Sequence, residues 1–130
     1  MNNNLYIVWN DNNNIGFPII DEQHRGIIST INSLYYFIQN GHGNEIIRPT
    51  MIMLSQYTQV HFKTEESIIE QTEYPALKEH LSLHKTLLER TKLLSADANT
   101  NSDPEMILRF LKQWWLNHIN HDDKQYAPYL

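Results

Sequence analysis

Histidine and carboxylate side chains interrupt the apolar stripes of this chain at helical spacing, and this pattern constrains the fold most. His61 and Glu65 lie four residues apart, and so do His80 and His84. Positions i and i+4 lie about 40° apart around an α-helix, so both side chains of such a pair can point at one atom. Because an unpaired buried polar group costs about 1–3 kcal/mol, these side chains need partners inside the fold.

Four segments of the chain show the periodicity of amphipathic helices. The first is predicted at about 21–40, before a glycine-rich stop, and the second at about 45–71. The third begins after Tyr74-Pro75, and the fourth opens with Asp103-Pro104 as an N-cap acid and a first-turn proline. Short connections make neighbouring helices antiparallel. The pattern therefore predicts an all-α, up-down-up-down four-helix bundle.

The chain has 130 residues, which is about the length of a single domain. We expect one domain over 1–130, with an N-terminal arm over 1–18 and the bundle over 19–130. Within the arm, a short apolar run is broken by an Asn-rich stretch and then by glycine and proline. We expect Tyr6, Trp9 and Phe17 to anchor this arm across the body of the bundle.

Composition excludes several classes of protein. Ten Lys+Arg against fifteen Asp+Glu give a net charge of −5, the wrong sign for binding nucleic acid or a polybasic membrane anchor. The absence of cysteine excludes disulfides, thiolate zinc sites and iron–sulfur clusters. No apolar run is long enough to span a membrane, and the first residues lack a signal-peptide pattern. We therefore expect a cytoplasmic protein without membrane insertion.

Each of the four apolar stripes carries at least one of these polar side chains. His24 extends the apolar face of the first segment by one turn, and His118 follows Trp114 by four residues in the fourth. One histidine on an apolar face is usually a hydrogen-bonded core residue, but histidines on four converging faces favour a metal site. Imidazole and carboxylate groups bind first-row transition metals, and bundle cores are where such sites are built.

The types of ligand narrow the chemistry further. Diiron carboxylate oxidases carry a Glu-x-x-His pair on each of two helices, and this sequence lacks that arrangement. About five histidines with two carboxylates provide few negatively charged ligands, so we expect the site to favour Fe(II). Such a site favours the binding of dioxygen over its insertion into a substrate.

Metal-binding motifs follow one another in a characteristic order. Asp21-Glu22-Gln23-His24 comes first, followed by HxxxE at 61–65, HxxxH at 80–84 and HxxxxD at 118–123. Around them stand Trp9, Gly16, Tyr74-Pro75, Trp114 and Tyr126-Ala127-Pro128. In this order and context the chain resembles the bacterial hemerythrins, which are non-haem diiron proteins that bind oxygen, over nearly its whole length.

The resemblance implies a set of metal ligands and an activity. One iron would be held by His80, His84 and His118, and the other by His24 and His61. Glu65 and Asp123 would bridge the two irons, together with an oxo or hydroxo oxygen from solvent. The iron with fewer protein ligands would keep an open position for dioxygen. The resemblance implies reversible oxygen binding for transport, storage or delivery, and no enzymatic turnover.

The identity of the second bridging carboxylate is left open by helical geometry. From His118, Asp122 lies at i+4 and Asp123 at i+5, which is about 140° around an ideal helix. Regular spacing favours Asp122. The resemblance favours Asp123, which requires a distorted turn such as a π-bulge.

Two tryptophans, Trp114 and Trp115, are predicted to line the oxygen pocket. Trp115 occupies a position where the family commonly has leucine, so its larger indole could narrow the pocket or donate a hydrogen bond to the ligand. Simple packing between helices is the alternative. Gln23 and Tyr126 are candidates for orienting the ligands. His42 is expected in solvent, and the resemblance assigns no ligand role to His121.

Four functions remain open from the sequence. The first is an oxygen carrier, whose partners are dioxygen and an oxygen-consuming enzyme. The second is an oxygen or redox sensor that acts through a separate signalling protein. The third is a diiron enzyme that reduces peroxide or nitric oxide, and the fourth is a bundle with structural zinc. Ligand type alone does not identify the metal, and the oligomeric state is left open.

Overall fold

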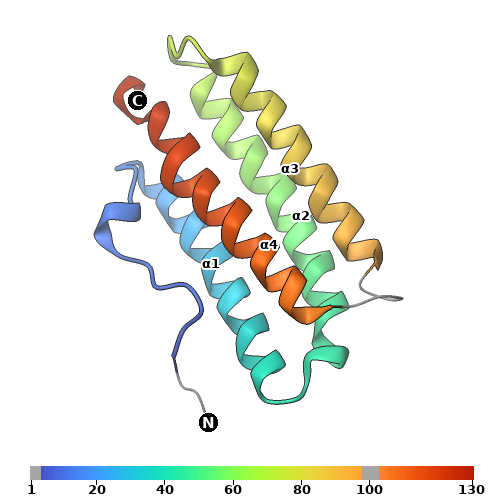
Figure 1. The fold of residues 1–130 in the computed structure, drawn as a ribbon. Helices are drawn as coiled ribbons and strands as arrows, with labels where there is room; N and C mark the ends of the chain where they lie inside the picture. The colour runs from blue at the N-terminus through green and yellow to red at the C-terminus, as the bar shows by residue number, and fades with distance from the viewer. Residues whose placement is uncertain (1–3, 98–102) are drawn as a thin grey trace.

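The computed structural model describes residues 4–97 and 103–130, and its helices form a four-helix bundle (Figure 1). In chain order they are α1 (Pro18–Gln39), α2 (Gly43–Ile69), α3 (Leu77–Asp97) and α4 (Pro104–Asn117). The helices alternate in direction, and the described residues contain no strand. The predicted up-down-up-down, all-α bundle is confirmed.

The first helix begins three residues earlier than predicted because its entry turn is fixed by one carboxylate. Asp21 accepts hydrogen bonds from the backbone N–H of Ile15, at 2.7 Å, and of Gly16, at 3.1 Å. Gly16 has a φ of +96°, a conformation that glycine adopts without strain. Pro18 then takes the first helical position, where its missing N–H costs no hydrogen bond.

The N-terminal segment lies against α1, as Figure 1 shows in blue. Asn32 holds it there, because its amide bonds both the N–H and the C=O of Ile7 at 2.8 Å. Tyr6 stacks on Tyr35 at 4.8 Å between ring centroids, and Trp9 is half-buried against the core. The division into an arm over 1–18 and a bundle over 19–130 stays a prediction.

Aliphatic side chains from all four helices fill the interior of the bundle. The fully buried members include Ile27, Ile31, Leu54, Leu87 and Leu111. At the end of the bundle where α2 passes into α3, buried polar side chains replace this apolar core. This change of chemistry marks the candidate site.

The last helix changes its geometry where the polar cluster begins. After Asn117 the chain forms one turn of π-helix, η2 (His118–Asp122), followed by two short 3₁₀ turns, η3 (Asp123–Gln125) and η4 (Ala127–Tyr129). A π-turn adds one residue to the hydrogen-bonded ring, and such turns are frequent at functional sites.

Among the described helices, none is long and apolar enough to cross a membrane.

Candidate metal centre

The structure brings all seven predicted ligands together inside one end of the bundle. Helices α1, α2 and α3 and the turns that follow α4 contribute, and each of these side chains is at most 3% exposed: His24 from α1, His61 and Glu65 from α2, His80 and His84 from α3, His118 from η2 and Asp123 from η3. Their ligand atoms form two groups, each within 4.8 Å. Glu65 and Asp123 belong to both groups.

The two oxygens of Glu65 face different sets of imidazoles. Its Oε1 lies 2.7 Å from His80 Nε2 and 2.9 Å from His84 Nε2. Its Oε2 lies 3.2 Å from His61 Nε2 and 3.6 Å from His24 Nε2. A carboxylate placed in this way can give one oxygen to each of two neighbouring cations.

Asp123 repeats this division on the opposite side of the cluster. Its Oδ1 lies 3.1 Å from the Nε2 atoms of both His80 and His118. Its Oδ2 lies 3.0 Å from His24 Nε2. Three imidazoles therefore surround Glu65 Oε1 and Asp123 Oδ1. The other two imidazoles surround Glu65 Oε2 and Asp123 Oδ2.

The π-turn decides which aspartate enters the cluster. Because the Asp123 N–H bonds to the C=O of His118, five residues back instead of four, Asp123 is brought onto the same side of the chain as His118. Asp122 remains outside, 30% exposed, with its Oδ2 at 3.3 Å from His118 Nδ1. Regular helical spacing misassigns the inner carboxylate here because the local helix is not regular.

Outward-facing nitrogens of the imidazoles are held by a second set of side chains. Gln23 Oε1 accepts from His61 Nδ1 at 2.8 Å, and Glu66 Oε2 accepts from His84 Nδ1 at 2.8 Å. Such bonds fix the ring and leave Nε2 free to bind a metal. Gln23 was a sequence candidate for this role, whereas Glu66 was not. Helical spacing gave no signal for Glu66, because its contact with His84 depends on how α2 and α3 pack together.

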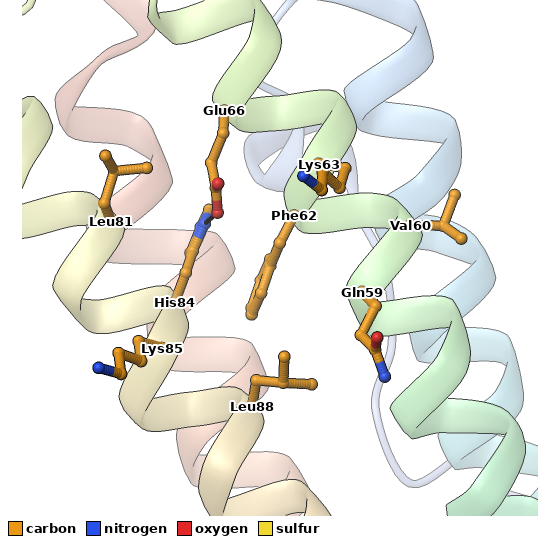
Figure 2. A pocket seen from close by; sticks show the side chains of 9 residues that line it. All are labelled: Gln59, Val60, Phe62, Lys63, Glu66, Leu81, His84, Lys85 and Leu88. Carbon is orange, nitrogen blue, oxygen red and sulfur yellow. Dashed lines mark hydrogen bonds and ion pairs between the residues drawn. The ribbon is translucent and has the colours of Figure 1, made fainter.

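A surface pocket reaches this outer layer from the side of α2 and α3 (Figure 2). Its volume is about 450 Å³, and its walls include Phe62, Glu66, His84 and Leu88. Figure 2 shows the Glu66 carboxylate pointing down at His84, with the Phe62 ring beside it. The Phe62 and His84 rings stack at 3.7 Å and are 3° from parallel. Glu66 thus lies between the Nδ1 atom of His84 and solvent.

Several inward-facing atoms of the cluster have no hydrogen-bond partner among the described residues. They comprise both ring nitrogens of His24, the Nε2 atoms of His61 and His118, Oε2 of Glu65 and both carboxylate oxygens of Asp123. Unsatisfied buried polar atoms are rare and costly in folded proteins. A group of lone pairs directed at one another without hydrogen bonds fits a bound cation, and imidazole with carboxylate suits iron.

Protonation of the imidazoles partly replaces a cation in the metal-free cluster. Burial opposes the charged form of His24 and of His80, but the nearby carboxylates of Asp123 and Glu65 outweigh it and raise each pKa to about 9. Burial likewise opposes the charge on His118, but mainly Asp123 raises its pKa to about 10. For His61 burial dominates and lowers the pKa. Protons and metal ions therefore compete for the same nitrogens.

The two carboxylates are held as anions by these imidazoles. Burial raises the pKa of a carboxyl group, but the four histidines that contact Glu65 hold its pKa well below its usual range. Burial and the charge of Glu65 oppose the ionisation of Asp123, but contacts with His118 and His24 lower its pKa below the usual value. Both side chains are therefore ionised and available as bridges.

The remaining predicted residues lie in different surroundings. Trp115 is fully buried, with its ring 5.8 Å from Phe62, and its Nε1 has no partner among the described residues. Trp114 is half-buried on the outer side, where the Arg90 guanidinium lies 5.0 Å from its ring. His42 and His121 have exposed side chains, at 59% and 77%. Lining of an oxygen pocket by Trp114 and Trp115 stays a prediction.

Tyr126 covers the cluster on the side away from the bundle interior. It is fully buried, and its ring lies 5.3 Å from that of His80. Burial, and then the charges of Glu65 and Asp123, raise its pKa far above the usual value, so it remains a neutral phenol. The cluster is therefore closed from solvent by an aromatic side chain.

Comparison with known proteins agrees with this geometry. Residues 16–130 match the family described as Hemerythrin HHE cation binding domain. A bacteriohemerythrin of Stenotrophomonas maltophilia is 33% identical over 93% of this chain and 79% of its own, and one of Methylococcus capsulatus is 31% identical over 90% and 88%. A myohemerythrin of Riftia pachyptila is 27% identical over 92% and 89%.

Among solved structures, one described as a leucine-to-phenylalanine mutant has the same fold. Its TM-score is 0.80 at 24% identity, over 95% of this chain and 96% of the other. The sequence relatives carry the family assignment, because this structural likeness shows the fold alone. On the match over residues 16–130 and the identity to the bacterial relatives, the chain belongs to the hemerythrin family, as a bacterial hemerythrin.

Proposed function

We propose that this protein binds dioxygen reversibly at a pair of iron ions held by the seven-residue cluster. The observation that carries the proposal is the pair of shared carboxylates between two groups of imidazoles. His80, His84 and His118 would hold one ion, and His24 and His61 the other. Glu65 and Asp123 would bridge them, together with a solvent-derived oxo or hydroxo group.

Unequal numbers of imidazoles support a role for only one of the two ions in binding the gas. The first group contains three histidines and the second contains two, with the same two carboxylates in each. A metal with fewer protein ligands keeps a position free for an external ligand. The open position would therefore belong to the ion that His24 and His61 would hold.

An iron pair, when bound, supplies the electrons for reversible dioxygen binding, and the surrounding residues control access to it. Ile27, Ile28 and Trp115 are at most 3% exposed and pack in the core below the cluster. Such a dry wall excludes water and strengthens electrostatic interactions inside. Glu65 and Asp123 remain anionic and offset the charge of the cations.

The family favours a carrier over an enzyme, because hemerythrins generally bind oxygen without turning over a substrate. We propose the same for this chain, with dioxygen as its ligand. Delivery to an oxygen-consuming enzyme, or signalling through a separate protein, remains a prediction. A cytoplasmic location is likewise a prediction.

The test is metal analysis of protein purified without oxygen, followed by optical spectra in air and again under argon. We expect two irons per chain and a charge-transfer band that appears with oxygen and disappears under argon. His84→Ala should lose iron from the three-histidine group, whereas His42→Ala, at an exposed position, should retain both irons. Colourless zinc-containing protein, or continuous consumption of oxygen, would contradict the proposal.

A further inference from the structure

Three tyrosines form a row from the metal cluster to the protein surface. The Tyr126 ring lies 5.3 Å from that of His80, the Tyr74 ring 6.2 Å from Tyr126, and the Tyr129 ring 5.3 Å from Tyr74. Exposure rises along the row: Tyr126 is fully buried, Tyr74 is partly buried, and Tyr129 is 45% exposed. The row thus joins a candidate metal ligand to solvent through aromatic rings alone.

Two separate segments of the chain build this row, and both are fixed by hydrogen bonds. Tyr74 lies in the turn between α2 and α3, where its N–H donates to Thr72 Oγ1 at 3.2 Å. Tyr129 donates its N–H to the C=O of Tyr126 at 2.8 Å, which sets the spacing of these two residues. Tyr126 also packs on Ile20 and Ile69 in a small second core. The rings therefore keep a defined arrangement.

Tyr74 occupies the middle of the row and joins its buried end to its exposed end. Its ring lies 6.4 Å from that of His80, so it can be reached from the cluster directly as well as through Tyr126. Tyr129 meets the row through its ring contact with Tyr74. The ring contacts of the cluster with Phe62 lead instead to a side chain that is far harder to oxidise than a phenol.

We propose that this row carries oxidising equivalents from the iron pair to the surface when a peroxide reacts there. The proposal rests on the proposed function, since it requires iron in the cluster. One-electron chemistry at non-haem iron is the property that a bound pair would supply. Each electron moves from Tyr129 to Tyr74 to the cluster, directly or through Tyr126, and the phenolic proton of Tyr129 is lost to water at the exposed end.

The reaction balances without a further reductant. One hydrogen peroxide takes two electrons and two protons and gives two waters. Tyr129 of the same molecule supplies the first electron and proton; its phenoxyl radical then takes a hydrogen atom from the exposed Tyr129 of a second molecule, and the restored phenol supplies the second electron and proton. The second molecule keeps one phenoxyl radical and the first molecule the other. Two such radicals then form one carbon–carbon bond between their rings, and the two displaced ring hydrogens return to the phenol oxygens. The iron pair ends in its starting oxidation state, and the imidazole ligands are spared.

The experiment adds half an equivalent of hydrogen peroxide per chain to iron-loaded protein whose iron content has been measured first. Radicals are detected by electron paramagnetic resonance of frozen samples, and oxidised or cross-linked tyrosines by mass spectrometry of peptides. We expect the modification at Tyr129. Tyr74→Phe, which leaves the proposed ligands intact, should abolish it without changing iron content, and Tyr129→Phe should leave the radical on Tyr74.

A matched control is available in Tyr36, which is 53% exposed but lies on α1 against Phe37. Tyr36→Phe should leave the modification of Tyr129 unchanged, and metal-free protein should show none. Equal modification of Tyr36 and Tyr129, or undiminished modification of Tyr129 in Tyr74→Phe, would overturn the row as a pathway. A protein that binds no iron would overturn the proposed function as well, so the two failures are distinct.

Discussion

At the scale of single residues, the outer hydrogen bonds of the imidazoles differ in charge. His61 is held by a neutral amide, from Gln23, whereas His84 is held by a carboxylate, from Glu66. A carboxylate makes the imidazole a more basic ligand than an amide does. The two metal positions therefore differ in their support as well as in their number of histidines.

Replacement of Glu66 tests this support. Glu66→Gln keeps the shape of the side chain but removes the charge next to His84, so iron affinity should fall by about 10–100-fold. Competition with a chelator measures the change. Glu70→Gln, at an exposed position one turn further along the chain, is the matched control and should retain the original affinity. Equal effects in the two variants would show a general charge effect and contradict a specific role for Glu66.

Trp115 provides the second test at this scale, because its buried Nε1 has no partner among the described residues. If the indole N–H donates to the bound oxygen ligand, Trp115→Phe removes that bond and should speed oxygen release about tenfold, for a hydrogen bond of about 1.4 kcal/mol. Trp115→Leu should add faster autoxidation because it also widens the pocket. Stopped-flow release and the decay of the oxygenated spectrum measure both rates. Unchanged rates in both variants would leave Trp115 as a packing residue.

At the scale of elements, the ends of the helices are stabilised separately from the cluster. Asp103 caps α4 by accepting from the N–H of Glu105 at 3.1 Å and of Met106 at 3.3 Å. Such caps satisfy two of the free N–H groups at a helix start. The opposite end of α4 is the one that carries His118.

Asp103→Ala should therefore lower the free energy of unfolding by about 1 kcal/mol without changing metal content. Urea denaturation and metal analysis of the same preparation give both quantities. Asp103→Asn, which can still accept these bonds, should lie close to the wild type. A loss of iron in Asp103→Ala would show that the start of α4 is coupled to the site at its other end.

At the scale of the whole molecule, the cluster links metal binding to stability. Four helices place imidazoles and carboxylates in one buried volume, so the metal-free bundle must balance their charges by protonation. The pKa of His24 and of His80 is about 9, and that of His118 about 10. All three are raised above the value of about 6.5 expected in the unfolded chain.

Raised pKa values predict the direction of the pH dependence. The stabilisation from these protonated histidines is complete below about pH 6.5 and is lost as pH rises through their folded pKa values. Metal-free protein should therefore lose at least about 1 kcal/mol of unfolding free energy between pH 7 and 10. Iron-loaded protein should show a weaker dependence, because metal-bound imidazole carries no titrating proton. If the unfolding free energy changed with pH to the same extent in both forms, protons and metal would not compete for these nitrogens.

The sequence alone predicted the bundle and the two i,i+4 pairs of candidate ligands from local periodicity, whereas the choice of Asp123 came from the resemblance to the hemerythrins. Apolar residues at helical spacing predict the four helices, and His61 with Glu65, like His80 with His84, share a face through i+4 spacing. The bounds of the helices were harder to predict, since the start of α1 depends on the bonds from Asp21 to the preceding turn.

Only the tertiary structure decided which groups from distant segments meet. The π-turn that brings in Asp123, the bond from Glu66 to His84 and the row of tyrosines all lie outside regular helical spacing. The physical reason is that periodicity describes one helix at a time. Contacts between helices, and departures from ideal helix geometry, are set by how the whole bundle packs.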